Sequence, residues 1–148
     1  MTNKLIVCMG NVCRSPAAKI ILNHLNNLNY KHEMSFDSAG ILNLPGKPMD
    51  KRSIKFLNEN GIKNFFHSSS TLNEKKASWA DLIYFFDFEI YDHLIKKFPK
   101  HKNKFQLFGK KNNGLIINDP INVSKKDYAF IMKNVYTSAH LNLKSFNK

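Results

Sequence analysis

Two residues near the start of the chain combine a nucleophile with an anion-binding group. Five residues separate Cys8 from Arg14, and Gly10 and Asn11 lie between them. A thiolate is a strong nucleophile, and the planar guanidinium of arginine offers paired N–H donors that match two phosphate oxygens. These residue types at this spacing predict nucleophilic attack on a phosphoryl group.

The segments around these two residues predict a strand, a loop and a helix. Residues 4–7 are mostly apolar and suit a buried strand. Gly10 and Asn11 tolerate the unusual backbone angles of a tight loop, and we expect a left-handed conformation at Asn11. Ser15 and Pro16 are typical of a helix start, with Ser15 as N-cap and Pro16 at the first helical position.

The loop should therefore cover a helix N-terminus, where free N–H groups and the macrodipole favour an anion. This setting should also favour the thiolate form of Cys8. Loop amides would surround the phosphate oxygens. The expected phosphate-binding loop comprises Met9, Gly10, Asn11, Val12, Cys13 and Ser15.

Strands and helices alternate along the rest of the chain. We expect strands at residues 4–7, 35–39, 81–86 and 104–108, and helices at residues 16–29, 49–60, 88–98 and 125–146. Alternation of this kind predicts an α/β fold with a four-stranded parallel sheet and helices on both faces. In such sheets ligands bind beyond the carboxyl ends of the strands, where the Cys8 loop begins.

Apolar spacing predicts which helix faces are buried. The first helix should bury Ala17, Ile21, Leu25 and Leu28. The last helix should bury Phe130, Ile131, Val135 and Ala139.

Size and composition favour one globular domain spanning residues 1–148, 43% of which are hydrophobic. The first apolar run is too short for a signal peptide, and no run approaches the length of a membrane helix. We expect a cytoplasmic protein, whose two cysteines form neither a disulfide scaffold nor a zinc site. No cofactor or metal is expected.

The chain carries a formal net charge of +12. A positive charge of this size suits binding to nucleic acid, binding to an anionic membrane surface, or electrostatic steering of acidic phosphorylated substrates. Because the lysines are scattered and no nucleic-acid-binding motif is found, we expect mainly a solvated surface. We therefore expect a monomer without a specific nucleic-acid or membrane partner.

The segment from Val7 to Pro16, Val-Cys-Met-Gly-Asn-Val-Cys-Arg-Ser-Pro, resembles the phosphate loop of the low-molecular-weight protein tyrosine phosphatases. The resemblance implies a flavodoxin-like sandwich that hydrolyses phosphotyrosine and other aryl phosphate monoesters. Cys8 would form a phosphocysteine, and Arg14 would stabilise the transition state. Besides capping the helix, the hydroxyl of Ser15 would stabilise the Cys8 thiolate when it is the leaving group. Tyrosine-phosphorylated proteins would be substrates, and inorganic phosphate would be both product and inhibitor.

The resemblance also implies roles for residues outside the loop. The family's general acid lies on a late Asp-Pro loop, which matches Asp119 and Pro120, the one Asp-Pro in the sequence. Ser38 and His67 match residues that support the loop asparagine, and residues 46–52 match the family's Gly-x-Pro-x-Asp-x-Arg segment.

The second cysteine of the loop has two interpretations. The family resemblance implies that oxidation joins Cys13 to Cys8 and so protects Cys8 from over-oxidation. Alternatively, Cys13 is a small buried residue beneath the loop.

The substrate slot departs from the family pattern. Aromatic residues usually follow the Asp-Pro and precede the Gly-x-Pro segment, but Ile121 and Asn122, and Asn43 and Leu44, stand there. Because aromatic pairs contribute about 0.5–1.5 kcal/mol each, we expect atypical and weaker phosphotyrosine preference. Ser70 also replaces a family arginine, while Val12 differs from the threonine of a branch that hydrolyses phosphoarginine.

Three other functions compete with this interpretation. Arsenate reductases share the fold but use further cysteines, and none follows Cys13. A module that only binds phosphoproteins needs neither Cys8 nor Asp119. A nucleic-acid binder is suggested by the net charge alone.

Overall fold

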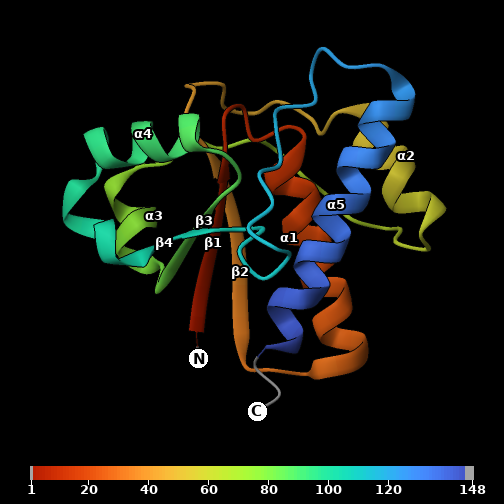
Figure 1. Cartoon of the computed structure of the whole chain (residues 1–148), viewed down its shortest axis with the longest axis horizontal. Coiled ribbons are helices and arrows are strands. Elements are labelled where there is room, and N and C mark those ends of the chain that lie inside the picture. Colours follow the sequence, from red (N-terminus) through yellow and green to blue (C-terminus); the bar gives the residue numbers. More distant parts are fainter. Residues whose placement is uncertain (1, 146–148) are drawn as a thin grey trace.

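The structure is a computed structural model that describes residues 2–145. Its sheet contains strands β1 (Thr2–Cys8), β2 (Met34–Gly40), β3 (Leu82–Phe85) and β4 (Phe105–Leu107). The strands are all parallel and lie in the order β2-β1-β3-β4 (Figure 1). The predicted α/β class with a four-stranded parallel sheet is confirmed.

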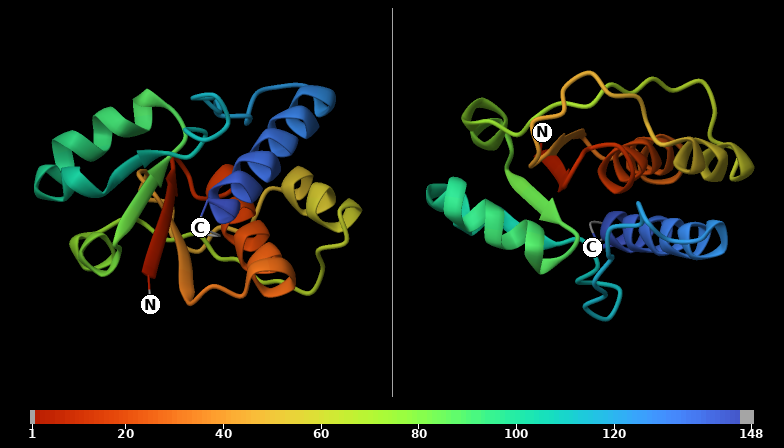
Figure 2. Two further views of the ribbon diagram at one scale, coloured as in Figure 1. Left: turned by 60° about the horizontal axis from the view of Figure 1, so that its bottom comes forward. Right: turned by 90° about the horizontal axis from the view of Figure 1, so that it is seen from above.

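Helices cover both faces of the sheet (Figures 1 and 2). On one side lie α1 (Arg14–Leu25), α2 (Lys51–Glu59) and α5 (Lys125–Lys144). On the other side lie α3 (Glu74–Trp79) and α4 (Phe88–Lys97). A π-helical turn, η1 (Asn26–Tyr30), extends α1, and a 3₁₀ helix, η2 (Pro99–Lys104), precedes β4. Among the described residues, no helix is long and apolar enough to cross a membrane.

The strand order fixes where the loops meet. The chain leaves β1 for α1 on one face and leaves β3 for α4 on the opposite face. Such a reversal opens a crevice at the carboxyl ends of the two strands. Cys8 is the last residue of β1, and its pairing partner Gly40 is the last residue of β2, so both lie at this edge.

The predicted start of the first helix is wrong by two residues, beside the Cys8 loop. Arg14 is already helical, and the capping residue Cys13 makes no side-chain cap hydrogen bond. Ser15 therefore lies inside the helix, and Pro16 occupies its third position. The hydroxyl of Ser15 is near Cys8 and Asn11 instead of capping the helix.

Two predicted faces also need correction. Ala17, Ile21 and Leu25 are buried, but Leu28 is 61% exposed because the π-helical turn shifts it away from the stripe. On α5 the buried stripe contains Tyr128, Met132, Val135, Ala139 and Leu143, while Phe130 is 64% exposed. The predicted end of this helix at residue 146 lies outside the described residues.

The sequence-based prediction also omitted the helix α3 and began the helix α2 too early. Asn73 caps the short α3 by accepting from the N–H of Lys76, but six residues are too few for a clear apolar period. The predicted helix at residues 49–60 begins at Lys51, because Asp50 is its cap and accepts from the N–H of Arg52.

Candidate active site

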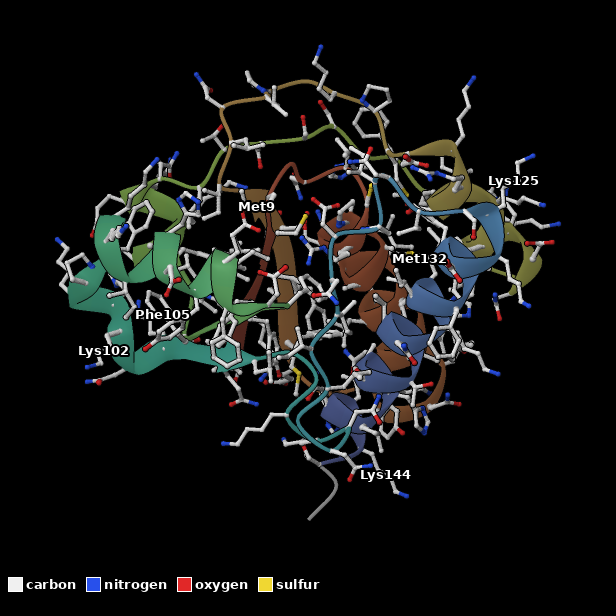
Figure 3. The ribbon with its side chains drawn as sticks, turned by 45° about the horizontal axis from the view of Figure 1, so that its top comes forward. Met9, Lys102, Phe105, Lys125, Met132 and Lys144 are labelled. Carbon is white, nitrogen blue, oxygen red and sulfur yellow. The ribbon has the colours of Figure 1, made fainter. Side chains whose placement is uncertain are left out.

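A pocket of about 90 Å³ lies against the loop between β1 and α1. A cavity needs only about 10–15 Å³ to hold one water, so this pocket has room for a tetrahedral oxyanion. Predicted site residues from three parts of the chain line it together. They are Cys8, Met9, Gly10, Val12, Cys13, Arg14, Leu44, Asp119 and Ile121. Leu42, which was not predicted, also lines the pocket. Figure 3 shows Met9 at this edge of the sheet.

Cys8 is buried but lines this pocket, and its sulfur contacts the hydroxyl of Ser15. Cys8 Sγ lies 2.9 Å from Ser15 Oγ, and Asn11 Nδ2 donates to the same hydroxyl oxygen at 2.7 Å. Because Asn11 occupies an acceptor site of that oxygen, the hydroxyl proton is available for the sulfur. The arrangement suits a hydroxyl that donates to a thiolate.

Asn11 is the structural centre of the loop. Its φ of 57° is left-handed, as predicted from its residue type. Its side chain accepts from the N–H of Ser70 at 3.0 Å and donates to Ser38 Oγ at 3.0 Å, so the orientation of its amide is fixed. Its backbone oxygen lies 2.7 Å from His67 Nε2. The structure thus brings Ser38 and His67 together around Asn11.

His67 must donate in this contact, because a carbonyl oxygen is only an acceptor. Burial lowers the pKa of His67 below its ordinary value, although the bond to Asn11 partly opposes the shift. The ring is therefore neutral at pH 7 with its proton on Nε2.

A close approach of β2 shapes the loop from the other side. A Cβ added to Gly40 would lie 3.0 Å from both the carbonyl carbon of Gly10 and the oxygen of Met9. These are backbone atoms that cannot rotate away, so the loop needs glycine here. The N–H groups of Ile41 and Leu42 also donate to the carbonyls of Cys8 and Met9, at 3.0 and 2.8 Å.

Arg14 is 1% exposed and anchored at two points. Its Nη1 donates to Asp87 Oδ2 and to the carbonyl oxygen of Ile117, both at 2.7 Å. Because Nη1 uses both of its N–H groups within the protein, Nη2 and Nε are the atoms that can donate to an anion in the pocket. Sequence reasoning missed Asp87, although its position just after a buried parallel strand marks the carboxyl edge of the sheet.

Asp119 enters the pocket from the loop between Ile117 and α5. The N–H of Ile117 donates to the carbonyl of Phe86 at 3.0 Å, which ties this loop to the end of β3. Asp119 is exposed, and its Oδ1 accepts from the N–H of Ile121 at 3.2 Å. A carboxyl on this side of the pocket can exchange a proton with a leaving group or a water molecule.

Cys13 lies under the loop, with its sulfur 3.8 Å from Asp50 Oδ2. Burial raises the pKa of its thiol to about 12, so Cys13 is protonated at neutral pH. Arg52, by contrast, lowers the pKa of Asp50 through its side-chain hydrogen bonds. Both cysteines are free thiols.

A lysine from α3 supports the loop from behind, and sequence reasoning missed it too. Lys76 Nζ donates to Asp37 Oδ2 at 2.9 Å, to Ser70 Oγ at 2.9 Å and to the carbonyl of Ser38 at 3.2 Å. Burial opposes ionisation of Asp37, but the hydrogen bonds from Lys76 and the N–H of Ser38 lower its pKa.

The rim of the pocket is aliphatic. Leu42, Leu44 and Ile121 line it and are 45%, 40% and 50% exposed. The other two substrate-pocket candidates, Asn43 and Asn122, do not line it. Asn43 instead accepts a hydrogen bond from Thr71 Oγ1 at 3.2 Å. Among residues 2–145, no cluster of His, Cys, Asp or Glu could hold a metal ion.

Comparison with known proteins agrees with this geometry. Residues 3–148 match the model of the family described as low molecular weight phosphotyrosine protein phosphatase. The chain is 30% identical over 137 residues to the low molecular weight protein-tyrosine-phosphatase Wzb of Escherichia coli, covering 93% of this chain and 90% of that protein.

Solved structures show the same fold. Vibrio vulnificus Wzb in complex with benzylphosphonate matches with a TM-score of 0.88 and 28% identity, over 97% of this chain and 98% of that one. The YwlE arginine phosphatase of Geobacillus stearothermophilus matches with a TM-score of 0.88 and 25% identity, over 99% and 93%. The chain therefore belongs to the low molecular weight phosphotyrosine protein phosphatase family.

Proposed function

We propose that the chain is a single phosphatase domain that hydrolyses phosphotyrosine in proteins through a phosphocysteine intermediate. One observation carries the proposal: a nucleophile, an anion clamp and a carboxyl acid, namely Cys8, Arg14 and Asp119, line one pocket. Arsenate reduction and mere phosphoprotein binding fit this set less well. Arsenate reduction on this fold needs further cysteines, and none follows Cys13 in this chain. A protein that only binds phosphoproteins needs neither Cys8 nor Asp119.

In the first step the Cys8 thiolate attacks phosphorus, and the S–P bond forms as the bond to the tyrosine oxygen breaks. Asp119 gives its proton to the departing oxygen. Nη2 and Nε of Arg14 would bind two phosphoryl oxygens, and loop amides from Met9 to Arg14 would bind the developing charge.

In the second step a water attacks the phosphocysteine. Asp119, now a carboxylate, takes the water proton, and inorganic phosphate leaves. The hydroxyl of Ser15 would donate to the sulfur as it regains its negative charge, consistent with their separation of 2.9 Å. Phosphate, as the product of the same pocket, should inhibit competitively.

Phosphoarginine is a second candidate substrate, since one structural neighbour is named an arginine phosphatase. Val12 lines the pocket but offers no hydroxyl to a guanidinium, which favours an aryl ester. The aliphatic rim of Leu42, Leu44 and Ile121 predicts weaker discrimination between aryl substrates than an aromatic slot would give.

Redox control and location remain predictions. A Cys8–Cys13 disulfide is supported by the shared loop, while the buried, hydrogen-bonded thiol of Cys13 equally suits a packing role. Two free thiols favour a reducing, cytoplasmic setting.

The test is turnover of matched phosphotyrosine, phosphoserine and phosphoarginine peptides by the parent, Cys8→Ser and Asp119→Ala. We expect phosphotyrosine to be the best substrate, no turnover by Cys8→Ser, and a loss of about 10²–10⁴-fold in kcat for Asp119→Ala. If the phosphoarginine peptide were hydrolysed faster than the phosphotyrosine peptide, phosphoarginine would become the assigned substrate. If Cys8→Ser hydrolysed the peptides as fast as the parent, the mechanism would be refuted.

A further inference from the structure

A second concavity of about 210 Å³ lies between α2 and the start of α5. The half-buried side chain of Phe56 contributes apolar surface to its lining, together with several basic side chains. The groove is defined by Lys51, Arg52, Lys55, Phe56, Lys125 and Tyr128.

Arg52 links the groove to the Cys8 pocket. The guanidinium of Arg52 lies 4.1 Å from the centre of the Tyr128 ring. The same guanidinium donates to the carbonyl oxygen of Ile121 at 3.2 Å, and Ile121 lines the Cys8 pocket. A chain that leaves the pocket past Ile121 therefore meets the groove next.

The charges of the groove are strongly unbalanced. Four basic side chains line it against one carboxylate, that of Glu59. Arg52 is paired with Asp50 at 2.9 Å, but Lys51, Lys55 and Lys125 are exposed. Lys51 and Lys125 are also the first residues of their helices, where the macrodipole favours negative charge. The helices therefore destabilise these two cations, and an acidic partner would relieve that cost.

We propose that this groove binds acidic residues that flank the phosphotyrosine of a protein substrate. The proposal rests on the phosphatase function and deepens it, since it names the substrate class as acidic phosphopeptides. Phe56 would contact the aliphatic part of a Glu side chain, while the lysines would bind its carboxylate. The hydrogen bond between Arg52 of the groove and Ile121 of the Cys8 pocket favours a substrate of that pocket over a nucleic acid as the occupant.

The experiment compares three substrates: a phosphotyrosine peptide with Asp and Glu flanks, the same peptide with Asn and Gln flanks, and p-nitrophenyl phosphate. The test variant is Lys51→Glu with Lys125→Glu. Both changes place an acid at a helix start, so they should stabilise the fold and not disrupt it. The matched control is Lys97→Glu with Lys102→Glu, which changes the net charge equally. Lys102 and Lys125 lie on opposite sides of the molecule (Figure 3).

We expect the parent to prefer the acidic peptide by about tenfold in kcat/KM, with the preference falling as salt rises. The test variant should lose this preference, while its turnover of p-nitrophenyl phosphate stays close to that of the control variant. Equal turnover of the two peptides by the parent, or an equal loss in the control variant, would overturn the proposal. So would a test variant that loses affinity for a DNA oligonucleotide but keeps the peptide preference. Failure of the phosphatase function itself would look different, because the parent would then hydrolyse none of the three substrates.

Discussion

Asp87 holds Arg14 in place through a buried ion pair, with Asp87 Oδ2 2.7 Å from Arg14 Nη1. The same carboxylate caps α4, because its Oδ1 accepts from the N–H of Ile90 at 2.9 Å. One side chain thus fixes both the start of a helix and the orientation of Arg14, the proposed anion clamp. Because Arg14 is held in this way, it would bind an anion through its remaining donors with little loss of conformational entropy.

Asp87→Asn separates these two roles, because asparagine caps a helix as well as aspartate does. The change leaves the buried Arg14 charge unpaired, which should lower the free energy of unfolding by about 3–5 kcal/mol. Urea unfolding measures this loss, and kcat/KM for p-nitrophenyl phosphate should fall with it. Unchanged stability and turnover would show that Arg14 needs no such partner.

Ser15→Ala removes the hydroxyl that lies 2.9 Å from Cys8 Sγ. A hydrogen bond to a charged group contributes about 1.5–3 kcal/mol, so kcat should fall about 10–100-fold. Alkylation of Cys8 by iodoacetate at neutral pH should slow as well. Ser138→Ala, at a buried serine on α5, is the control. A Ser15→Ala variant as fast as this control would exclude the proposed contact with the leaving sulfur.

Lys76→Met tests whether the cation behind the loop positions Asn11. Lys76 reaches Asn11 through Ser70, whose hydroxyl it binds and whose N–H donates to Asn11 Oδ1. We expect kcat/KM to fall by about fivefold, the equivalent of one hydrogen bond of about 1 kcal/mol, and Lys76→Arg to restore most of it. Inhibition by phosphate should weaken in parallel. A loss of thermal stability with normal phosphate affinity would indicate a purely structural role.

Stability should fall in alkaline solution. The pKa of the Cys13 thiol rises from 9.0 to about 12 on folding, and burial raises the pKa values of Tyr84 and Tyr128 too. Between these two pKa values the folded chain keeps the Cys13 proton, whereas the unfolded chain has lost it. The contribution of Cys13 to the free energy of unfolding is therefore complete below pH 9 and declines as the pH rises toward 12. Urea unfolding across this range should show the decline, with a shallower slope for Cys13→Ala. Identical slopes would mean that Cys13 is not buried as a thiol.

The parallel sheet and the Cys8 loop could be predicted from the sequence because both depend on local residue patterns. An apolar run followed by Gly10 and Asn11 needs no distant partner to be interpreted. The contacts made by Lys76 and Asp87 join residues 39 and 73 positions apart, and no local pattern contains that information. Leu28 and Phe130 were misassigned for another reason, since one π-helical turn or a one-residue phase error rotates an apolar stripe away from the core.

The most direct test of the account asks whether phosphate becomes attached to sulfur at position 8. The parent and Asp119→Ala would be mixed with p-nitrophenyl phosphate, quenched with acid within the first turnover, digested and analysed by mass spectrometry. The account predicts a phosphorylated peptide that contains Cys8, formed with a burst of p-nitrophenol and absent in Cys8→Ser. Steady turnover by the parent without any phosphate on Cys8, or the same turnover by Cys8→Ser, would contradict it.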